Sequence, residues 1–227
     1  MKLDTIFQWS DESPRDCPYQ MALDEALFRF SQSSGTAVLR FYSWESEALT
    51  FGYSESYPKD AESKAVRRFT GGGRVEHGED LTFLLTLPAG SPPALLNASQ
   101  RYQWIHESLR NALAEADFPL DSEPTRKFLA TGPCFETPVP FDLLASGSGK
   151  KIVGGAQRRS RGSVIHQGSL RIPAPLRQES ARWRNLFAQQ LTGRLVPFPS
   201  EDIESLEEKA RELVEERYAN DAWNHRR

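Results

Sequence analysis

The chain has 227 residues, a formal net charge of −3 at pH 7 and two cysteines. This length suffices for one globular unit with its own core, and we expect a single catalytic domain over 1–227. Charges of both signs are interspersed, which excludes the basic surface typical of nucleic-acid-binding proteins, and two cysteines exclude a disulfide framework.

Hydrophobic runs are short throughout the chain. None approaches the roughly 18 consecutive apolar residues of a membrane helix, and residues 1–14 lack the apolar centre of a signal peptide. The sequence therefore predicts a cytoplasmic protein that binds neither membranes nor nucleic acid.

The first half of the chain alternates helical and extended patterns. Residues 18–30 carry apolar side chains along one stripe after an initial proline, which predicts an amphipathic helix. Residues 37–44 and 48–53 are rich in β-branched and aromatic residues and predict two strands separated by a polar turn. Residues 81–87 predict a further strand, which Pro88 ends.

The second half begins with the longest predicted helix, over 98–116, which has its apolar residues on one side. Residues 141–145 and 150–159 predict strands paired across an SGSG turn, and 163–172 predicts a third. From about 177 onward the pattern indicates charge-rich helices. We therefore expect an α/β (α+β) fold with a mixed, largely antiparallel sheet flanked by helices.

Three successive glycines interrupt the extended segments of the first half; they are Gly71, Gly72 and Gly73. They permit positive φ and let a ligand approach backbone N–H groups, which can bind an oxyanion or a phosphate. Arg67 and Arg68 precede them and are candidates for binding a carboxylate or phosphate. Taken alone, the glycines more often form a hairpin turn. GSGKK at 147–151 lacks the first glycine and the Ser or Thr of a P-loop, which excludes a Walker-type ATPase.

Four segments, in order, carry a resemblance to a known family. The RRxTGGGxVxH pattern at 67–77 resembles the signature of the biotin/lipoate protein ligase and transferase superfamily. MALDEALF at 21–28 is similar to its N-terminal helix, and 38–53 to its next two strands. KIVGGAQRR at 151–159 resembles the segment with the essential lysine. The resemblance implies a class II aminoacyl-tRNA synthetase/biotin synthetase-like fold with an acyl tunnel between the glycines and the lysine strand.

Within that superfamily a cysteine separates octanoyltransferases from ATP-dependent lipoate-protein ligases. Residues 134–157 resemble the transferase pattern, in which a cysteine and an aromatic residue precede the lysine strand. Cys134 is then the expected nucleophile and Lys151 the expected catalytic lysine, since the KIVGGAQ register favours Lys151 over Lys150. Ligases usually also carry an added C-terminal domain. The segment expected to be helical after 172 is short for such a domain, which favours an octanoyltransferase over a ligase.

The chemistry of this pair is consistent with an enzyme that needs no cofactor. Exchange of a thioester between thiols is nearly isoenergetic, so ATP is not required if a thiolate is available. The Lys151 ammonium would lower the pKa of Cys134 and stabilise the oxyanion. The second half-reaction requires a proton acceptor for the attacking lysine, which the sequence does not identify.

Other candidate residues are weaker. Cys17 is the rival nucleophile because a helix N-terminus also favours a thiolate, but it lies outside the family's nucleophile position. His77 is a candidate for closing the acyl or phosphopantetheine site, and as readily a hydrogen-bonded strand histidine. Where the family often has a histidine directly before the glycine, this chain has Gln167, with His166 one residue earlier. The remaining histidines are expected to face solvent; they are His106 and His225.

The resemblance therefore predicts an octanoyltransferase that moves an octanoyl group from acyl carrier protein, through Cys134, to a lysine of a lipoyl domain or the glycine-cleavage H protein. The small residues expected to line the acyl tunnel beside the three glycines are Gly154, Gly155 and Ala156. Three alternatives stay open. They are a lipoate-protein ligase that uses MgATP, an amidotransferase between lipoyl carriers, and a non-catalytic acyl-carrier-binding protein, which the retention of Cys134 and Lys151 disfavours.

Overall fold

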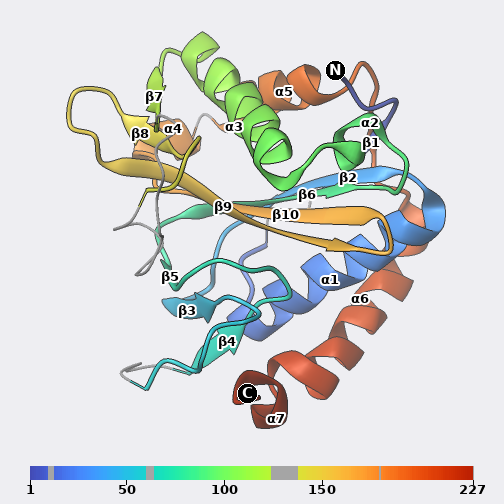
Figure 1. Cartoon of the computed structure of the whole chain (residues 1–227). Coiled ribbons are helices and arrows are strands. Elements are labelled where there is room, and N and C mark those ends of the chain that lie inside the picture. Colours follow the sequence, from blue (N-terminus) through green and yellow to red (C-terminus); the bar gives the residue numbers. More distant parts are fainter. Residues whose placement is uncertain (10–12, 60–63, 124–137, 179, 227) are drawn as a thin grey trace.

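The computed structural model describes residues 1–9, 13–59, 64–123, 138–178 and 180–226. Two sheets and several helices make up this part of the chain, with the larger sheet between layers of helix (Figure 1). Within these ranges no helix combines the length and the apolar character needed to cross a membrane.

The larger sheet has eight strands in the described residues, in the order β11-β1-β2-β6-β10-β9-β8-β7. The strands β11, β1 and β2 run parallel, and each further pair of neighbours is antiparallel. The predicted mixed, largely antiparallel sheet is confirmed. The strands are β1 Ile6–Trp9, β2 Ala37–Tyr42, β6 Leu81–Leu87, β7 Leu120–Ser122, β8 Leu143–Ala145, β9 Lys151–Ser160, β10 Ser163–Leu170 and β11 Leu195–Pro197.

A second, three-stranded sheet contains β3 (Ala48–Phe51), β4 (Ala65–Arg67) and β5 (Val75–His77), with β3 in the middle. The segments 37–44 and 48–53 are therefore strands, as predicted, but they belong to different sheets. The three glycines lie between β4 and β5, which pair with opposite edges of β3. The glycine segment is thus anchored at both ends.

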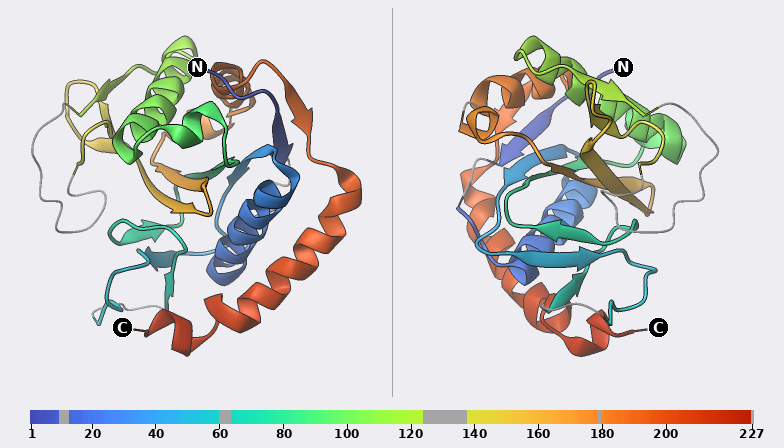
Figure 2. Two further views of the ribbon diagram at one scale, coloured as in Figure 1. Left: turned by 45° about the vertical axis from the view of Figure 1, so that its right-hand side comes forward. Right: turned by 90° about the vertical axis from the view of Figure 1, so that its left-hand side faces the viewer.

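Helices cover both faces of the larger sheet (Figures 1 and 2). The helices α3 (Ala98–Glu115) and α5 (Ser180–Leu191) pack on one face, and α1 (Cys17–Ser34) packs on the other. The helix α6 (Ile203–Leu213) packs against the outer side of α1. The shorter helical segments are α2 Pro92–Leu95, α4 Ala174–Gln178, the 3₁₀ turn Ser200–Asp202, the π-helical turn Val214–Tyr218 and α7 Asp221–Asn224.

Strand alternation divides the core into two clusters. In β2, Leu39 and Phe41 join the cluster under α3 and α5, whereas Val38 and Tyr42 join the cluster under α1 and α6. This is the period-2 arrangement of a sheet buried on both faces. The helix predicted at 18–30 is confirmed as α1.

The region after 177 differs in one respect from the predicted run of helices. It contains β11, which pairs in parallel with β1 at the edge of the sheet. A strand of three residues has too little periodicity to be recognised alone, and pairing with a partner far away in the sequence defines it.

Candidate functional site

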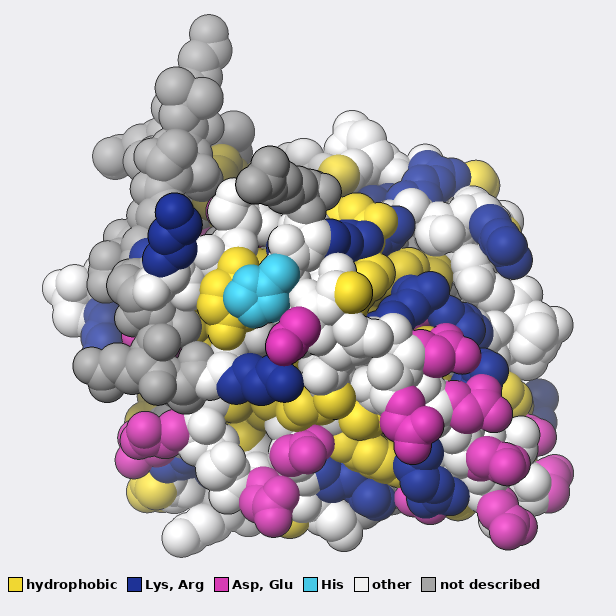
Figure 3. Space-filling view, turned by 90° about the horizontal axis from the view of Figure 1, so that it is seen from below, with side chains coloured by type: hydrophobic (Ala, Val, Ile, Leu, Met, Phe, Trp, Pro, Cys, Tyr) yellow, Lys and Arg dark blue, Asp and Glu magenta, His cyan; other side chains and the backbone are white. Residues whose placement is uncertain are grey.

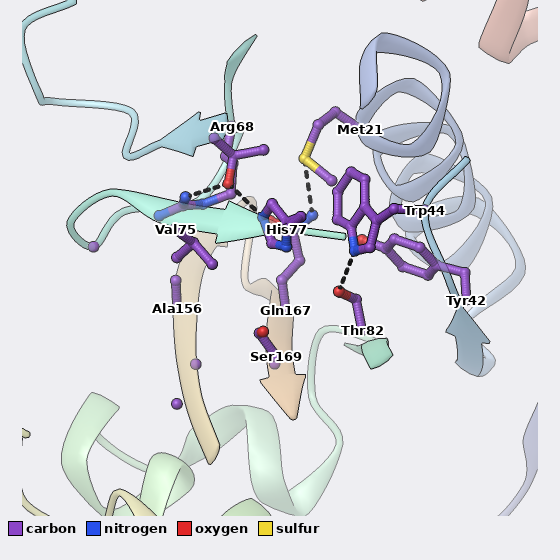
Figure 4. Close-up of a pocket in the computed structure, with 15 residues that line it drawn as sticks. Met21, Tyr42, Trp44, Arg68, Val75, His77, Thr82, Ala156, Gln167 and Ser169 are labelled. Atoms are coloured by element: carbon purple, nitrogen blue, oxygen red, sulfur yellow. Dashed lines mark hydrogen bonds between the residues drawn. The ribbon is translucent and has the colours of Figure 1, made fainter. Parts of the chain in front are cut away.

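A cavity lies between the smaller sheet and the face of the larger sheet that α1 covers (Figure 4). The space not filled by atoms, including the open mouth, amounts to about 420 Å³. Small residues and apolar side chains make up much of its wall. The lining residues are Met21, Tyr42, Trp44, Thr50, Arg68, Gly72, Val75, His77, Thr82, Gly154, Gly155, Ala156, Gln167, Gly168 and Ser169.

Many of the predicted substrate-binding residues meet at this cavity. Its wall includes Gly154, Gly155 and Ala156 from β9, Gly72 from the glycine segment, Arg68 and His77. The structure therefore brings the glycine segment and the lysine strand together, as the resemblance implied. Gly71, Gly73 and Arg67 are not among the lining residues.

Close backbone packing explains why the glycine segment needs small residues. A Cβ on Gly52 would lie 1.9 Å from the Gly72 carbonyl oxygen, and a Cβ on Gly72 would lie 3.3 Å from the Ala156 Cβ. Gly72 also has a φ of +85°, which favours glycine. The glycine segment is thus packed between the end of β3 and β9. It is not a hairpin turn that projects on its own from the protein.

Arg68 organises this segment from inside. Its guanidinium donates to the carbonyl oxygens of Gly71 and Gly73 at 2.9 and 2.8 Å, and to the Thr50 hydroxyl at 2.7 Å. The side chain is almost fully buried beside the cavity. Arg68 therefore holds the backbone on both sides of Gly72.

Arg67 has a different environment from the one predicted. Its five N–H groups all donate to backbone carbonyl oxygens, at 2.5 to 3.1 Å. Its guanidinium also lies over the Phe51 ring. Because these bonds use every donor, Arg67 has no N–H left for a phosphate. The acceptors are the carbonyl oxygens of Tyr53, Glu55, Trp223, Asn224 and Arg226.

His77 lies in a hydrogen-bonded chain on the cavity wall. Its Nδ1 is 2.8 Å from Asp80 Oδ2, and its Nε2 is 2.8 Å from Thr50 Oγ1. The Asp80 carboxylate can only accept, so Nδ1 carries the hydrogen, and Nε2 of the neutral ring accepts from the Thr50 hydroxyl. The ring also stacks on Trp44 at 3.9 Å (Figure 4). Burial lowers the pKa of His77, and the Asp80 carboxylate opposes that effect.

Lys151, the predicted catalytic lysine, forms a buried ion pair. Its Nζ lies 2.7 Å from Asp142 Oδ2, and both side chains are almost inaccessible to solvent. Asp142 Oδ1 accepts from the Tyr102 hydroxyl at 2.5 Å, and that hydroxyl accepts from the Gly155 N–H at 2.8 Å. Burial raises the pKa of Asp142, and Lys151 and Tyr102 oppose that effect.

The position of Lys151 relative to the predicted nucleophile stays a prediction. Cys134 lies outside the residues that the structure describes, and Lys151 is not among the residues that line the cavity. The Lys151 network is nevertheless linked to the cavity wall, because Tyr102 bonds the backbone of Gly155.

Two buried histidines lie behind Gly155, on the α3 side of the sheet. The rings of His106 and His166 are 5.4 Å apart, and a Cβ on Gly155 would come within 3.1 Å of a nitrogen of each. The prediction that His106 faces solvent is wrong, because this position of α3 points onto β9 and is fully buried. His225 is exposed, as expected, and stacks on Tyr57.

These histidines are held neutral. His106 Nδ1 lies 2.9 Å from the Phe141 carbonyl oxygen, whereas its Nε2 and both ring nitrogens of His166 lack a hydrogen-bond partner among the described residues. Burial lowers the pKa of His106 to about 3 and the pKa of His166 well below its usual value. Neither ring is therefore protonated near neutral pH.

A second polar network, which sequence reasoning missed, connects α1 to the glycine segment. Asp24 accepts hydrogen bonds from Arg40, Tyr42 and Gln167 at 2.7 to 2.8 Å. Gln167 in turn accepts from the Thr70 hydroxyl at 2.6 Å. Asp24 falls three residues after Met21 and three before Leu27, on the apolar stripe of the helix, and this was the available signal, since a buried carboxylate requires partners. Gln167 thus supports the glycine segment from the place where the family often has histidine.

Cys17 does not fit the role of rival nucleophile. It is the first residue of α1 and is buried. Burial raises the pKa of its thiol, and the Asp16 carboxylate adds to the increase. Desolvation therefore outweighs the effect of the helix N-terminus, and the thiolate is disfavoured.

Comparison with known proteins identifies the family. The family model of the lipoyl protein ligase A/B catalytic domain matches residues 16–195. The chain belongs to this family. It is 25% identical to an octanoyltransferase LipM of Halalkalibacterium halodurans, over 97% of this chain and 99% of that protein. It is 32% identical to an octanoyltransferase LipM of Oceanobacillus iheyensis, over 70% of this chain and 62% of that protein.

The fold of this family member also matches solved structures. A crystal structure of lipoate-protein ligase A bound with ATP aligns with a TM-score of 0.71 and 22% identity, over 99% of each chain. The superfamily and the fold class predicted from the sequence are both confirmed.

Proposed function

We propose that this family member is a cytoplasmic octanoyltransferase. It moves an octanoyl group from acyl carrier protein, through a thioester on Cys134, to a lysine of a lipoyl domain or of the glycine-cleavage H protein. The observation that carries this proposal is the similarity to an octanoyltransferase along nearly the whole of both chains. A second full-length relative, the octanoyltransferase LipM of Lysinibacillus sphaericus, is 28% identical and supports the same class of reaction.

In the first half-reaction, the Cys134 thiolate attacks the carbonyl carbon of the donor thioester. A new carbon–sulfur bond forms, and the bond to the donor sulfur breaks. The departing donor thiolate then takes up the proton that the Cys134 thiol released on ionising. The buried Lys151 ammonium supports this step as a source of positive charge that Asp142 keeps oriented. A pre-oriented charge stabilises the oxyanion without reorganisation during the reaction.

In the second half-reaction, the neutral amine of the acceptor lysine attacks the Cys134 thioester. A carbon–nitrogen bond forms and the carbon–sulfur bond breaks. The proton lost by the amine balances the thiolate that leaves, so the enzyme returns to its starting state without ATP.

The cavity is the proposed site of the acyl chain. Met21, Trp44, Val75 and Ala156 contribute apolar surface to its wall, and Gly72 also lines it. An apolar wall suits a saturated hydrocarbon chain because binding removes that chain from water.

The test is the intact mass of the protein after brief incubation with octanoyl-acyl carrier protein in the absence of ATP. We expect an octanoyl adduct that hydroxylamine removes. The adduct should disappear in Cys134→Ser and persist in Cys17→Ser, which is the matched control at the buried cysteine. If no adduct forms, yet lipoate and MgATP together modify a lipoyl domain, the protein is a ligase and the proposal is wrong.

A further inference from the structure

Two arginines meet at one aromatic ring close to the glycine segment. The Arg158 guanidinium lies 3.8 Å from the centre of the Tyr53 ring, and the Arg226 guanidinium lies 3.7 Å from it. The Arg158 guanidinium also lies 4.0 Å from the centre of the Phe69 ring, and the Arg226 guanidinium lies 4.0 Å from the centre of the Trp223 ring. The aromatic rings therefore hold both cations in place.

No carboxylate among the described residues forms an ion pair with either arginine. Arg158 donates to the Phe69 carbonyl oxygen at 3.1 Å, and Arg226 donates to the Tyr53 carbonyl oxygen at 3.2 Å. Hydrogen bonding toward both guanidiniums lowers the pKa of the Tyr53 hydroxyl. Two like charges close together without a counter-ion form a place where an anion is stabilised.

The arginines lie next to the part of the cavity wall that Ala156 and Gly72 form. Arg158 follows Ala156 by two positions on β9, so the two side chains point to the same face of the strand. Its partner Phe69 comes directly before Thr70 and the three glycines. Arg226 is brought to the same place by α7, which Arg67 holds through backbone carbonyl bonds. Figure 3 shows that Lys and Arg side chains lie among hydrophobic ones on the face that carries the C-terminal end.

These contacts favour Arg158 and Arg226 over Arg67 and Arg68 as the residues that bind a phosphate. The sequence indicated Arg67 and Arg68, but Arg67 uses all its donors on carbonyl oxygens, and Arg68 holds the backbone around Gly72. Arg158 and Arg226 keep donors that no carboxylate of the described residues occupies.

We propose that Arg158, Arg226 and Tyr53 form an anion site for the phosphodiester of the phosphopantetheine arm that carries the acyl group. This inference rests on the proposed function. In a donor of this class the acyl end must enter the cavity while the phosphodiester stays at the mouth. Guanidinium groups bind phosphate oxygens by paired hydrogen bonds, and the bound anion removes the repulsion between the two arginines.

The test compares three octanoyl donors that differ in one feature at a time. They are octanoyl-acyl carrier protein, octanoyl-4′-phosphopantetheine and octanoyl-pantetheine, which lacks the phosphate. We expect Arg158→Gln and Arg226→Gln each to raise KM roughly 10-fold for the first two donors and to leave KM for octanoyl-pantetheine unchanged. Higher salt should reduce the difference between wild type and variants.

The control is Arg159→Gln, which removes the same charge from the next position of β9, where the exposed side chain points to the opposite face. It should leave KM for all three donors unchanged. Equal losses on all three donors in the Arg158 and Arg226 variants would mean that the arginines only shape the glycine segment. A raised KM for octanoyl-acyl carrier protein alone would mean that the two arginines bind carboxylates on the surface of the carrier protein. Either result overturns the inference, as does the absence of any loss.

Failure of the proposed function is distinguishable from failure of this inference. If wild type transfers from none of the donors, the octanoyltransferase proposal fails. Calorimetric titration of wild type with 4′-phosphopantetheine, with pantetheine as the comparison, then still tests the anion site. Binding of 4′-phosphopantetheine that the Arg158→Gln/Arg226→Gln double variant loses would support the site, and no preference for the phosphate-bearing compound would overturn it.

Discussion

The Lys151 ammonium and the Asp142 carboxylate lie 2.7 Å apart in the interior of the protein. Asp142 also accepts from the Val139 N–H and from Tyr102, whose hydroxyl is bonded to the backbone of the cavity wall at Gly155. A buried charge with this many partners has its orientation fixed, and the loss of one partner is costly.

Asp142→Asn therefore should lower the free energy of unfolding by about 3 kcal/mol, because Lys151 is left without a counter-charge. The Lys151 side chain would also lose the partner that orients it, so formation of the octanoyl-enzyme should slow. Urea denaturation and single-turnover mass measurements check the two effects. Asp121→Asn, at an exposed position of β7, is the control and should change neither. Wild-type stability in Asp142→Asn would contradict the prediction.

Arg67→Ala should destabilise the protein by about 3 kcal/mol and loosen α7, because five backbone carbonyl oxygens lose a charged donor. Hydrogen exchange should become faster over 219–226 and in β4. Arg211→Ala removes an exposed arginine that pairs only weakly with Glu207, at 4.0 Å, and should cost less than about 0.5 kcal/mol. Unchanged exchange in Arg67→Ala would show that α7 is held by other contacts.

Ala156→Leu should shorten the acyl chain that the protein transfers. The Ala156 side chain lies on the cavity wall, close to Gly72, so a larger side chain occupies space that the acyl chain would use. Transfer of octanoyl should fall roughly 10-fold or more relative to butanoyl, since each methylene in an apolar pocket contributes about 1–3 kcal/mol. Competition between the two donors measures this ratio. Ala114→Leu, at an exposed position of α3, should leave the ratio unchanged, and an unchanged ratio in Ala156→Leu would place the acyl chain elsewhere.

The stability of the protein should fall as the pH falls below about 6.5, the usual pKa of histidine. His106 and His166 have lowered pKa values in the folded state, so below this pH the unfolded chain binds protons that the folded chain does not. Each ring contributes a loss of about 1.4 kcal/mol per pH unit, and for His106 the loss ends near its folded pKa of about 3.

Urea denaturation at pH 7.5, 6 and 5 tests this dependence. The difference between wild type and His166→Gln isolates the contribution of one ring from that of the buried carboxyl groups. His225→Gln, at an exposed histidine, should follow the wild-type curve. The idea fails if His166→Gln loses stability with falling pH as steeply as wild type does.

Local patterns in the sequence were sufficient for the longer helices and strands and for the family, but not for short strands such as β11. The apolar stripe of 18–30, the β-branched runs and the paired segments around the SGSG turn each reflect a period that a helix or strand imposes on its own residues. The glycine segment and the lysine strand were identified by motif, and both contribute to one cavity.

The partners of individual side chains depended on the tertiary structure. Arg67 and Arg68 are adjacent in the sequence and chemically identical, yet one saturates carbonyl oxygens around α7 and the other holds the glycine segment. His106 was expected at the surface because α3 alone does not show which residues face β9. Burial, hydrogen-bond partners and pKa arise from contacts between distant segments, and local sequence determines period and propensity but not those contacts.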